Sequence, residues 1–381
     1  MKDVLLVTPY YDPNIVGGAE ISTQLIAEGL PARCDVLSFG PSDCQRRLNG
    51  VDIYEMSFSG FCGLWARPLG GTKLSVGDKM LGHFGDLWPK PSIVRRYLDF
   101  FSAHQYKTII MNSNERVMDR PSLWKAAHES GAHVVLTLRD NLLLERSIGG
   151  LDYSGLYRRL IRKQLCWVDE LVAPSQYMID LYAEYQMAKK VSRVIPNAVK
   201  DPDVKAVPFS QKKDVLYAGS LSEQKGLLTL IEAVDGFVAD ENLTLIGRGP
   251  LSEAICGGGR VFKFDWMPKD ELYRAMAKAK VLVLPSEWPE AFGRVLVEAV
   301  RCGTLVVGSN AGGIPEVLSF DDRYLFQSGD SAALVDRVNR ILCLSEGEYV
   351  QELDKLQKKM KMFDLGHYLA AWSSVVEGTV V

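Results

Sequence analysis

The stretch from Val281 to Val317, VLVLPSEWPEAFGRVLVEAVRCGTLVVGSNAGGIPEV, constrains the fold of this chain more than any other. It starts with an apolar run, Val281 to Leu284, of the kind that forms a buried parallel strand. A loop then leads to a helical pattern that begins at Gly293. A second strand over Thr304 to Gly308 is followed by another glycine-rich loop and helix. Two consecutive strand–loop–helix units predict a parallel sheet with two helix N-termini at one edge.

The residues at this edge indicate the kind of ligand that it binds. Ligands of such sheets bind outside the carboxyl ends of the strands, where free N–H groups and helix dipoles favour phosphate. Two carboxylates, Glu290 and Glu298, fall at the same edge. Because carboxylates repel phosphate, we expect them to meet a neutral group rich in hydroxyls, such as a sugar. Phosphate donors beside hydroxyl acceptors predict a nucleotide-sugar pocket.

The run from Glu290 to Glu298 resembles the E-x7-E signature of retaining GT-B glycosyltransferases of the GT4 type, the glycosyl transferases group 1. The surrounding pattern, P-S-x-x-x-E-x-F-G followed by E-A-x-x-x-G-T-x-V-V-G-S-x-x-G-G, agrees along the whole stretch. Two glutamates alone occur more often on a solvated helix face. The glycines, Pro285 and the flanking strands argue against that interpretation here.

The resemblance implies an α/β chain of two doubly wound, Rossmann-like parallel-sheet domains that face a cleft, the GT-B fold. It also implies retaining transfer of a sugar from a nucleotide diphosphate donor, UDP- or GDP-linked, to a hydroxyl acceptor. The acceptor class is open: a saccharide, a lipid-linked saccharide or a small molecule, in bacterial polysaccharide or glycoconjugate biosynthesis. No cofactor is expected, because the nucleotide sugar is a substrate, and no metal.

Composition agrees with an ordinary globular protein of two domains. The chain has 381 residues, 47% of them hydrophobic and 24% charged, with a net charge of −3. This balance argues against a general nucleic-acid binder, since no strongly basic field offsets phosphate repulsion. Seven scattered cysteines without a C-x-x-C pair predict reduced thiols in a cytoplasmic protein. The N-terminus is expected to be a strand and not a signal peptide, and no run reaches the ~18 apolar residues of a membrane span.

Alternating strand and helix patterns divide the chain into two domains, 1–199 and 214–364. The resemblance implies that the first is the acceptor-side domain and the second the nucleotide-sugar donor domain. The segment 200–213 is polar, contains two prolines and lacks periodicity, so we expect a linker there. In GT-B folds the last helix crosses back to the first domain, and the amphipathic segment 365–381 suits that role. The resemblance is strong after Val215 and looser before it.

In the first half, a strand over Asp3 to Thr8 is followed by Gly17 and Gly18 and a helix from Ile21 to Leu30. Glycine lets backbone N–H groups approach a phosphate closely, but the pair equally suits a tight turn. In the family this loop closes over the donor phosphates and the reaction centre, which favours the functional interpretation. The pattern is not G-x-G-x-x-G, so a dinucleotide cofactor is disfavoured.

Arg139 and Asp140 follow a predicted strand over His133 to Leu138. Family members commonly have a His-Asp pair here, with the histidine near the transferred sugar, and Arg139 is a departure from that pattern. One interpretation is that Arg139 contacts an acidic acceptor or a phosphate while Asp140 accepts a hydroxyl proton or anchors Arg139. The other is a structural ion pair at a strand end.

The helix predicted from Tyr157 to Leu165 is basic and amphipathic. It either docks on an anionic membrane that carries a lipid-linked acceptor or presents a solvated face, and the second interpretation is favoured. Peripheral contact with the inner face of a membrane therefore stays open.

The loop from Gly219 to Gly226 resembles the family's G-R-L…K-G, in which Arg and Lys both hold the diphosphate. Ser220 stands where the arginine is expected, and a hydroxyl cannot replace a bidentate guanidinium. Diphosphate binding is therefore expected to depend on Lys225 together with Arg294 or Arg248. An exposed lysine is the alternative for Lys225.

The resemblance also assigns the remaining contacts. Glu298 is expected to bind the ribose hydroxyls, and Glu290 the hydroxyls of the transferred sugar. Trp266 and Met267 lie where the family cradles the base, with Trp266 either stacking on the base or forming an apolar wall. The predicted catalytic residues are Glu290, Lys225, Arg139 and Asp140. The predicted donor-binding residues are Gly17, Gly18, Gly219, Ser220, Lys225, Arg248, Trp266, Met267, Glu290, Ala291, Phe292, Gly293, Arg294 and Glu298.

Two rival functions remain. The substitutions at Arg139 and Ser220 are also compatible with a catalytically inactive GT-B protein that binds a saccharide or a partner enzyme. A GT-B phosphorylase or trehalose-type synthase is the rival among enzymes, and no convincing pyridoxal-phosphate lysine supports the former.

Overall fold

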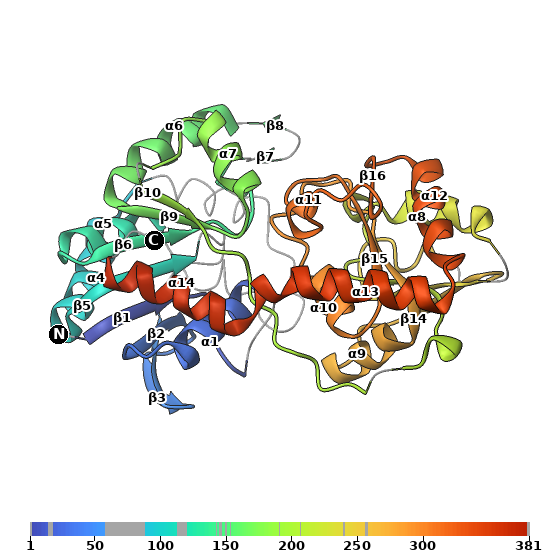
Figure 1. The fold of residues 1–381 in the computed structure, drawn as a ribbon. Helices are drawn as coiled ribbons and strands as arrows, with labels where there is room; N and C mark the ends of the chain where they lie inside the picture. Colours follow the sequence, from blue (N-terminus) through green and yellow to red (C-terminus); the bar gives the residue numbers. More distant parts are fainter. Residues whose placement is uncertain are drawn as a thin grey trace. The chain divides into compact units, whose positions relative to one another are not determined.

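The structure is a computed structural model that describes residues 2–13, 18–57, 88–112, 120–141, 143–144, 147–148, 151–152, 154–189, 191–205, 207–238, 241–255 and 258–378. The chain divides into two compact units (Figure 1). The N-terminal unit comprises Met1–Ile195 together with Tyr368–Val381, and the C-terminal unit comprises Pro196–His367. Each unit is a sheet covered by helices, as predicted. The assignment of 1–199 to the acceptor and of 214–364 to the donor stays a prediction.

The N-terminal unit is built on an eight-stranded sheet of order β10-β9-β6-β5-β1-β2-β4-β3. Its strands are β1 (Lys2–Val7), β2 (Cys34–Phe39), β3 (Cys44–Leu48), β4 (Val51–Met56), β5 (Tyr106–Asn112), β6 (His133–Thr137), β9 (Glu170–Ala173) and β10 (Val191–Val194). Neighbouring strands pair in parallel except β3, which runs antiparallel to β4 at the edge. A separate two-stranded sheet joins β7 (Ser147–Ile148) and β8 (Leu151–Asp152). The apolar central strands, such as Val4–Val7, are almost fully buried, as both faces of a covered parallel sheet require.

The helices of this unit are α1 (Gly18–Gly29), α4 (Pro91–His104), α5 (Arg120–Glu129), α6 (Ser154–Gln164) and α7 (Gln176–Glu184). Buried polar side chains hold α1 against the carboxyl ends of the strands. Asn112, the last residue of β5, donates a hydrogen bond to Thr23 Oγ1 on α1 at 3.0 Å. Thr137, the last residue of β6, donates to Asn112 Oδ1 at 2.8 Å. This network fixes the direction in which α1 leaves the sheet.

The C-terminal unit has a six-stranded sheet of order β13-β12-β11-β14-β15-β16 whose strands all pair in parallel. They are β11 (Lys213–Ala218), β12 (Leu243–Ile246), β13 (Val261–Phe264), β14 (Ala279–Leu284), β15 (Leu305–Ser309) and β16 (Leu325–Phe326). The apolar run that predicted a buried strand forms the centre of this core, where Val281, Leu282 and Val283 are at most 1% exposed.

The helices of the C-terminal unit are α8 (Leu227–Ala233), α9 (Lys269–Lys278), α10 (Arg294–Arg301), α11 (Ile314–Val317), α12 (Ser331–Leu342) and α13 (Glu346–Met360). Single 3-10 turns occur at Leu165–Trp167 in the N-terminal unit and at Phe209–Gln211, Glu223–Lys225, Val234–Gly236 and Lys361–Phe363 in this one. The helix expected after the second glycine loop is only the four residues of α11, so its dipole is small.

Helix α14 (Leu365–Glu377), drawn in red in Figure 1, begins in the C-terminal unit and belongs to the N-terminal unit from Tyr368 onward. Tyr368, Trp372 and Val375 are buried there. Arg193 Nη1 of β10 donates to Ser374 Oγ at 3.3 Å, which ties the helix to the sheet.

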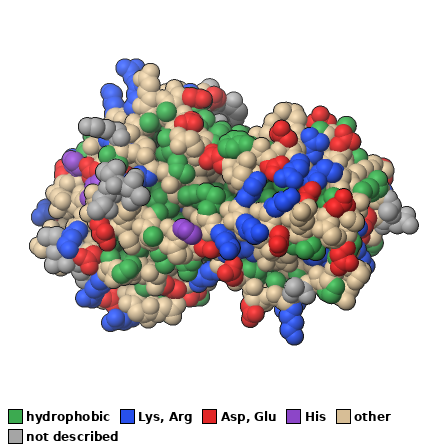
Figure 2. All heavy atoms as spheres, in the orientation of Figure 1, with side chains coloured by type: hydrophobic (Ala, Val, Ile, Leu, Met, Phe, Trp, Pro, Cys, Tyr) green, Lys and Arg blue, Asp and Glu red, His purple; other side chains and the backbone are tan. Residues whose placement is uncertain are grey.

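Acidic and basic side chains are interspersed on the face of the molecule that Figure 2 shows. Several are paired within the C-terminal unit, including Arg323 with Asp321 and Arg340 with Glu352. None of the helices in the described part of the chain has both the length and the apolar character needed to span a bilayer.

Candidate functional site

Three loops meet at the carboxyl edge of the C-terminal sheet. They follow β11, β14 and β15, and backbone hydrogen bonds join them. The N–H groups of Glu287 and Trp288 donate to the Gln224 carbonyl at 3.0 and 2.8 Å, and Gly313 N–H donates to the Glu290 carbonyl at 2.7 Å. The central loop, which carries Glu290, is therefore held from both sides.

Two glycines make this close packing feasible. Gly226 has a φ of +65°, and a Cβ at this position would lie 1.8 Å from the Pro285 carbonyl oxygen. Gly312 has a φ of +64°, and its Cβ would lie 2.3 Å from the Glu290 carbonyl oxygen. Side chains at either position would clash with the backbone, so glycine is required by contact as well as by conformation.

The Glu290 carboxylate is the centre of a small charged cluster. Lys225 Nζ lies 2.6 Å from Glu290 Oε1, and Ser286 Oγ donates to the same oxygen at 2.5 Å. The two charged side chains keep 32% and 18% of their surface exposed, so a ligand can reach both. Burial, and then the Glu290 carboxylate, raise the pKa of the Tyr217 phenol, which therefore stays protonated and donates to the Ser220 carbonyl at 2.6 Å.

Helix α10 begins directly beyond this cluster. Gly293, with a φ of +91°, is its N-cap, so the N–H groups of Phe292, Gly293 and Arg294 lie at a helix N-terminus. The first N–H groups of a helix have no partner within the helix and favour anions. The Arg294 Nη1 atom is buried and has no hydrogen-bond partner in the described part of the chain. It adds a cationic donor at the same end of the helix.

Glu298 lies in the second turn of α10 and is 8% exposed. Its Oε1 atom is 3.4 Å from Arg294 Nε and 3.4 Å from Lys269 Nζ on α9. Burial, and then the Glu298 carboxylate, raise the pKa of the Tyr273 phenol, which keeps it a neutral hydrogen-bond donor. Two cations and a phenol thus fix this carboxylate.

The loops after β12 and β13 complete the edge. Gly247 approaches Gly219 so closely that a Cβ at position 247 would lie 1.9 Å from the Gly219 carbonyl oxygen. Arg248 is bound by Asp265, with Nη2 2.7 Å from Oδ2, and this hydrogen bond lowers the pKa of the exposed Asp265 carboxyl. Trp266 is 69% exposed, so its indole is accessible either for stacking on a base or as an apolar wall of the base site.

The remaining predicted donor residues of this unit lie where the pattern places them along the chain. Gly219 and Ser220 are exposed at the end of β11, and Met267 is half-buried against the core of the unit. Ala291 lies between Glu290 and the N-terminus of α10.

The predicted residues of the N-terminal unit form a separate group. Gly18 is the first residue of α1, whereas Gly17 lies outside the described residues. Arg139 and Asp140 follow β6 and are half-buried. The Asp140 carbonyl accepts a hydrogen bond from Tyr182 Oη at 3.1 Å, and burial raises the pKa of that phenol well above its usual range.

The basic helix predicted from Tyr157 is α6 in the structure. Arg158 Nη1 donates to the Leu144 carbonyl at 2.8 Å, and Arg162 Nη1 donates to Gln186 Oε1 at 2.6 Å. Arg159 and Lys163 are exposed on the helix. Part of the charge therefore serves contacts within the unit.

Three residues that contribute to the site were not predicted: Ser286, Lys269 and Tyr273. Ser286 belongs to the P-S pair that follows β14, and its fully buried hydroxyl donates to Glu290 Oε1. Lys269 and Tyr273 are spaced four apart on α9, with the ammonium 5.2 Å from the ring centroid. That spacing places them on one helix face but gives no indication that Glu298 lies opposite.

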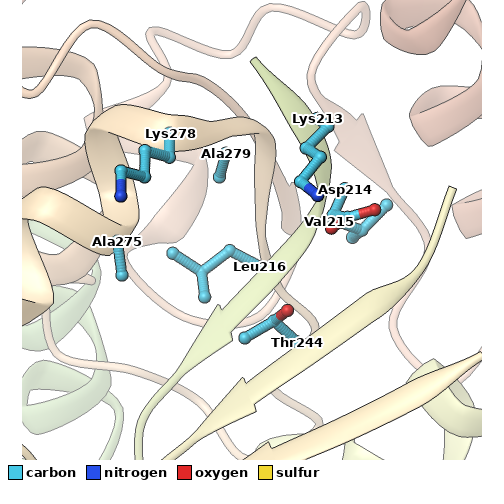
Figure 3. Close-up of a pocket in the computed structure, with 8 residues that line it drawn as sticks. All are labelled: Lys213, Asp214, Val215, Leu216, Thr244, Ala275, Lys278 and Ala279. Atoms are coloured by element: carbon cyan, nitrogen blue, oxygen red, sulfur yellow. The ribbon is translucent and has the colours of Figure 1, made fainter. Parts of the chain in front are cut away.

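A separate pocket of about 160 Å³ lies at the other end of this sheet (Figure 3). Its lining includes Lys213 at the start of β11, Ala279 at the start of β14 and Lys278 at the end of α9. The volume is below the roughly 300 Å³ of typical small-molecule sites. This pocket is therefore not a candidate for the nucleotide-sugar site.

Comparison with known families covers almost the whole chain. The model described as Glycosyltransferase Family 4 matches residues 16–201, and the model described as Glycosyl transferases group 1 matches residues 200–360. An uncharacterized 42.6 kDa protein in the cps region of Klebsiella pneumoniae is 27% identical over 350 residues, which is 83% of this chain and 87% of that protein.

Solved structures show the same fold over the full length. Sucrose-phosphate synthase from Thermosynechococcus elongatus superimposes with a TM-score of 0.75 at 17% identity, covering 99% of both chains. HepE of Anabaena, solved in complex with UDP and glucose, has a TM-score of 0.73 at 18% identity and covers 99% of this chain and 100% of its own. The chain therefore has the GT-B fold and belongs to the GT4 family, the glycosyl transferases group 1, as a nucleotide-sugar-dependent glycosyltransferase.

Proposed function

We propose that the chain transfers a hexose from a UDP- or GDP-sugar to a hydroxyl acceptor, with retention of configuration and without a metal ion. The acceptor is a saccharide, a lipid-linked saccharide or a small molecule of bacterial polysaccharide or glycoconjugate synthesis. The relative in the cps region and the UDP and glucose bound to HepE support this choice.

The observation that carries the proposal is the Lys225–Glu290 pair, 2.6 Å apart at the rim where α10 begins. An ammonium and a carboxylate that neutralise each other can exchange partners when a ligand brings both a diphosphate and sugar hydroxyls. Lys225 then binds the diphosphate, and Glu290 accepts hydrogen bonds from the transferred sugar. In this proposal the N–H groups of Phe292 and Gly293, at the N-terminus of α10, donate to the same diphosphate.

In the proposed reaction the acceptor oxygen bonds to the anomeric carbon on the face from which the diphosphate leaves. The bond between that carbon and the diphosphate oxygen breaks, and the acceptor proton passes to the departing phosphate oxygen. Negative charge grows on the diphosphate, where Lys225, Arg294 and the α10 N-terminus stabilise it. Same-face displacement retains the configuration of the sugar.

The other predicted residues take supporting roles. We place the ribose hydroxyls at Glu298, whose carboxylate is oriented by Arg294 and Lys269. The base lies at the loop of Trp266 and Met267. Arg139, Asp140 and the loop of Gly17 and Gly18 serve the acceptor side and the reacting groups.

Replacing Glu290 with glutamine tests the proposal. Glu290→Gln keeps the size of the side chain but removes the charge that holds sugar hydroxyls. We expect transfer to fall roughly 100-fold, while calorimetric affinity for UDP or GDP is unchanged or tighter because Lys225 loses its internal partner.

Glu287→Gln is the matched control, because Glu287 lies in the same loop and accepts its hydrogen bond from Thr229 at 2.6 Å. Wild-type turnover in Glu290→Gln would refute the role of Glu290. The alternative of an inactive protein that binds a saccharide or a partner enzyme, which Arg139 and Ser220 keep open, predicts neither transfer nor hydrolysis of any donor sugar by the wild-type chain.

A further inference from the structure

Arg301, the last residue of α10, holds an unusual set of backbone and side-chain acceptors. Its side chain is only 8% exposed. Nη1 donates to the Val199 carbonyl at 2.6 Å and to Asp201 Oδ1 at 2.7 Å. Nη2 donates to the Met360 carbonyl at 3.4 Å and to Asp364 Oδ1. One guanidinium thus contacts four acceptors in two distant parts of the chain.

Those two parts are the segments by which the chain enters and leaves the C-terminal unit. The chain enters after Ile195 and leaves after His367. Val199 and Asp201 belong to the entering segment, and Met360 and Asp364 precede the exit. The Val199 N–H also donates to the Phe363 carbonyl at 3.1 Å, so the two connections are joined directly as well.

The opposite end of α10 contacts the exit segment too. The Phe292 ring, next to the N-cap, packs edge-on against the Phe363 ring with centroids 5.2 Å apart. The eight residues of α10 span about 12 Å as a rigid rod. Helix α10 therefore contacts the exit segment near its N-terminus and both connections at Arg301.

The Arg301 contacts stabilise the unit, since removing a guanidinium that is 8% exposed would leave the Val199 and Met360 carbonyls without this donor. The pair with Asp201, whose side chain is 87% exposed, contributes at most about 1 kcal/mol of that. The contacts with the Val199 and Met360 carbonyls also fix the position of the two connecting segments, because the planar fork of arginine binds several acceptors in fixed directions. A lysine at this site could not hold both connections in the same way.

We propose that Arg301 is a positioning residue that couples occupancy of the donor site, at the start of α10, to the two connections between the units. The inference rests on the proposed function in one respect, namely that a nucleoside diphosphate binds at the N-terminus of α10. Binding there orders the donor loop, residues 288–298. Because Arg301 ends the same helix, it then restrains the connecting segments around Val199 and Asp364.

Hydrogen exchange measured by mass spectrometry tests the coupling without an activity assay. The full chain is compared with and without UDP, and in parallel GDP, as wild type, Arg301→Ala and Arg301→Lys. Peptides over 288–298 report the donor loop, and peptides over 196–205 and 358–367 report the connections. At about 100 times the Kd, we expect nucleotide to slow exchange at least threefold in all three wild-type regions.

In both Arg301 variants we expect protection of 288–298 to remain and protection of the two connections to fall to less than about half of the wild-type effect. Should Arg301→Ala fail to fold, Arg301→Lys, which keeps the charge, carries the test. Arg340→Lys is the matched control, because Arg340 makes a bidentate ion pair with Glu352 at 2.8 and 3.0 Å in the same unit.

The outcomes separate the two proposals. No protection of 288–298 by either nucleotide in the wild type would refute the donor site itself. Protection of 288–298 with unchanged connections in the wild type, or equal protection of the connections with and without Arg301, would overturn the coupling while leaving the donor site intact.

Discussion

At the scale of single residues, the site is a set of charges that are compensated before any ligand arrives. Lys225 is paired with Glu290, and Arg294 and Lys269 with Glu298. An uncompensated carboxylate beside a phosphate site would weaken binding by repulsion, so the internal cations let the acidic residues lie there. We therefore expect binding of a nucleotide sugar to exchange one set of partners for another at modest electrostatic cost.

The sequence predicts the residues whose spacing is set by a continuous motif, such as Glu290 and Glu298, but not those that depend on contacts between loops. Lys269 on α9 orients Glu298 from a separate element, whereas Ser286 lies in the same loop as Glu290, and the motif does not show that its hydroxyl contacts that carboxylate. No pattern along the chain reveals that a residue of α9 lies opposite one of α10. The choice between Arg294 and Arg248 stays a prediction: Asp265 binds the exposed Arg248 guanidinium, and Arg294 has a buried donor without a partner among the described residues.

Removing the Lys225 ammonium tests whether this lysine exchanges Glu290 for the diphosphate when the donor binds. Lys225→Met should weaken calorimetric binding of UDP or GDP by about 1.5–3 kcal/mol, or roughly 10- to 100-fold, the usual contribution of a hydrogen bond to a charged group. Part of that loss would come from the carboxylate left unpaired.

The double variant Lys225→Met with Glu290→Gln separates the two effects, because it removes the repulsion and should recover part of the affinity. Lys278→Met, at the opposite end of the sheet, is the control and should bind as the wild type does. Affinity that is unaltered in Lys225→Met would reject the assignment of this lysine to the diphosphate.

At the scale of elements, the strands that formed as predicted are those with continuous apolar runs. Strands β6, β14 and β15 are largely buried, and their sequences contain few polar residues. Strand β3, CQRRL, was not predicted, because an edge strand with a largely exposed surface has no apolar run to mark it. Its antiparallel pairing with β4 depends on the turn at Asn49 and Gly50, both with positive φ.

The glycine loops are elements whose backbone conformation is as important as any side chain. Gly312→Ala should force the loop of Glu290 to shift, since its Cβ would meet the Glu290 carbonyl oxygen at 2.3 Å and the amide nitrogen at 2.6 Å. We expect a loss of about 2–3 kcal/mol in the free energy of unfolding, above the ~1 kcal/mol of a positive φ alone.

Gly329→Ala is the matched control, because Gly329 has a φ of +78° and nothing within 4 Å of its Cβ position. Urea unfolding and nucleotide calorimetry on both variants make the comparison. If Gly312→Ala were no less stable than Gly329→Ala and bound nucleotide equally well, the close approach of these loops would have no energetic consequence.

At the scale of the whole molecule, both units carry their candidate residues at the carboxyl edge of a parallel sheet. This placement follows from the fold itself and was predictable once alternating strands and helices were recognised. The acceptor side was less predictable. Its residues are spread over separate loops of the N-terminal unit, after β6 and before α1, and no continuous motif joins them.

The charge balance of the donor unit leads to a last prediction, about metal ions. In the proposed site, Lys225, Arg294 and the α10 N-terminus would offset the departing diphosphate and so supply the positive charge that a divalent cation provides in other transferases. Turnover should therefore be unaffected by EDTA, and added Mg²⁺ or Mn²⁺ should change it by less than about twofold. The measurement is the initial rate of transfer after dialysis against chelator. Activity that disappears on chelation and returns with a divalent ion would show that these cationic groups are insufficient, and would place a metal ion beside the diphosphate.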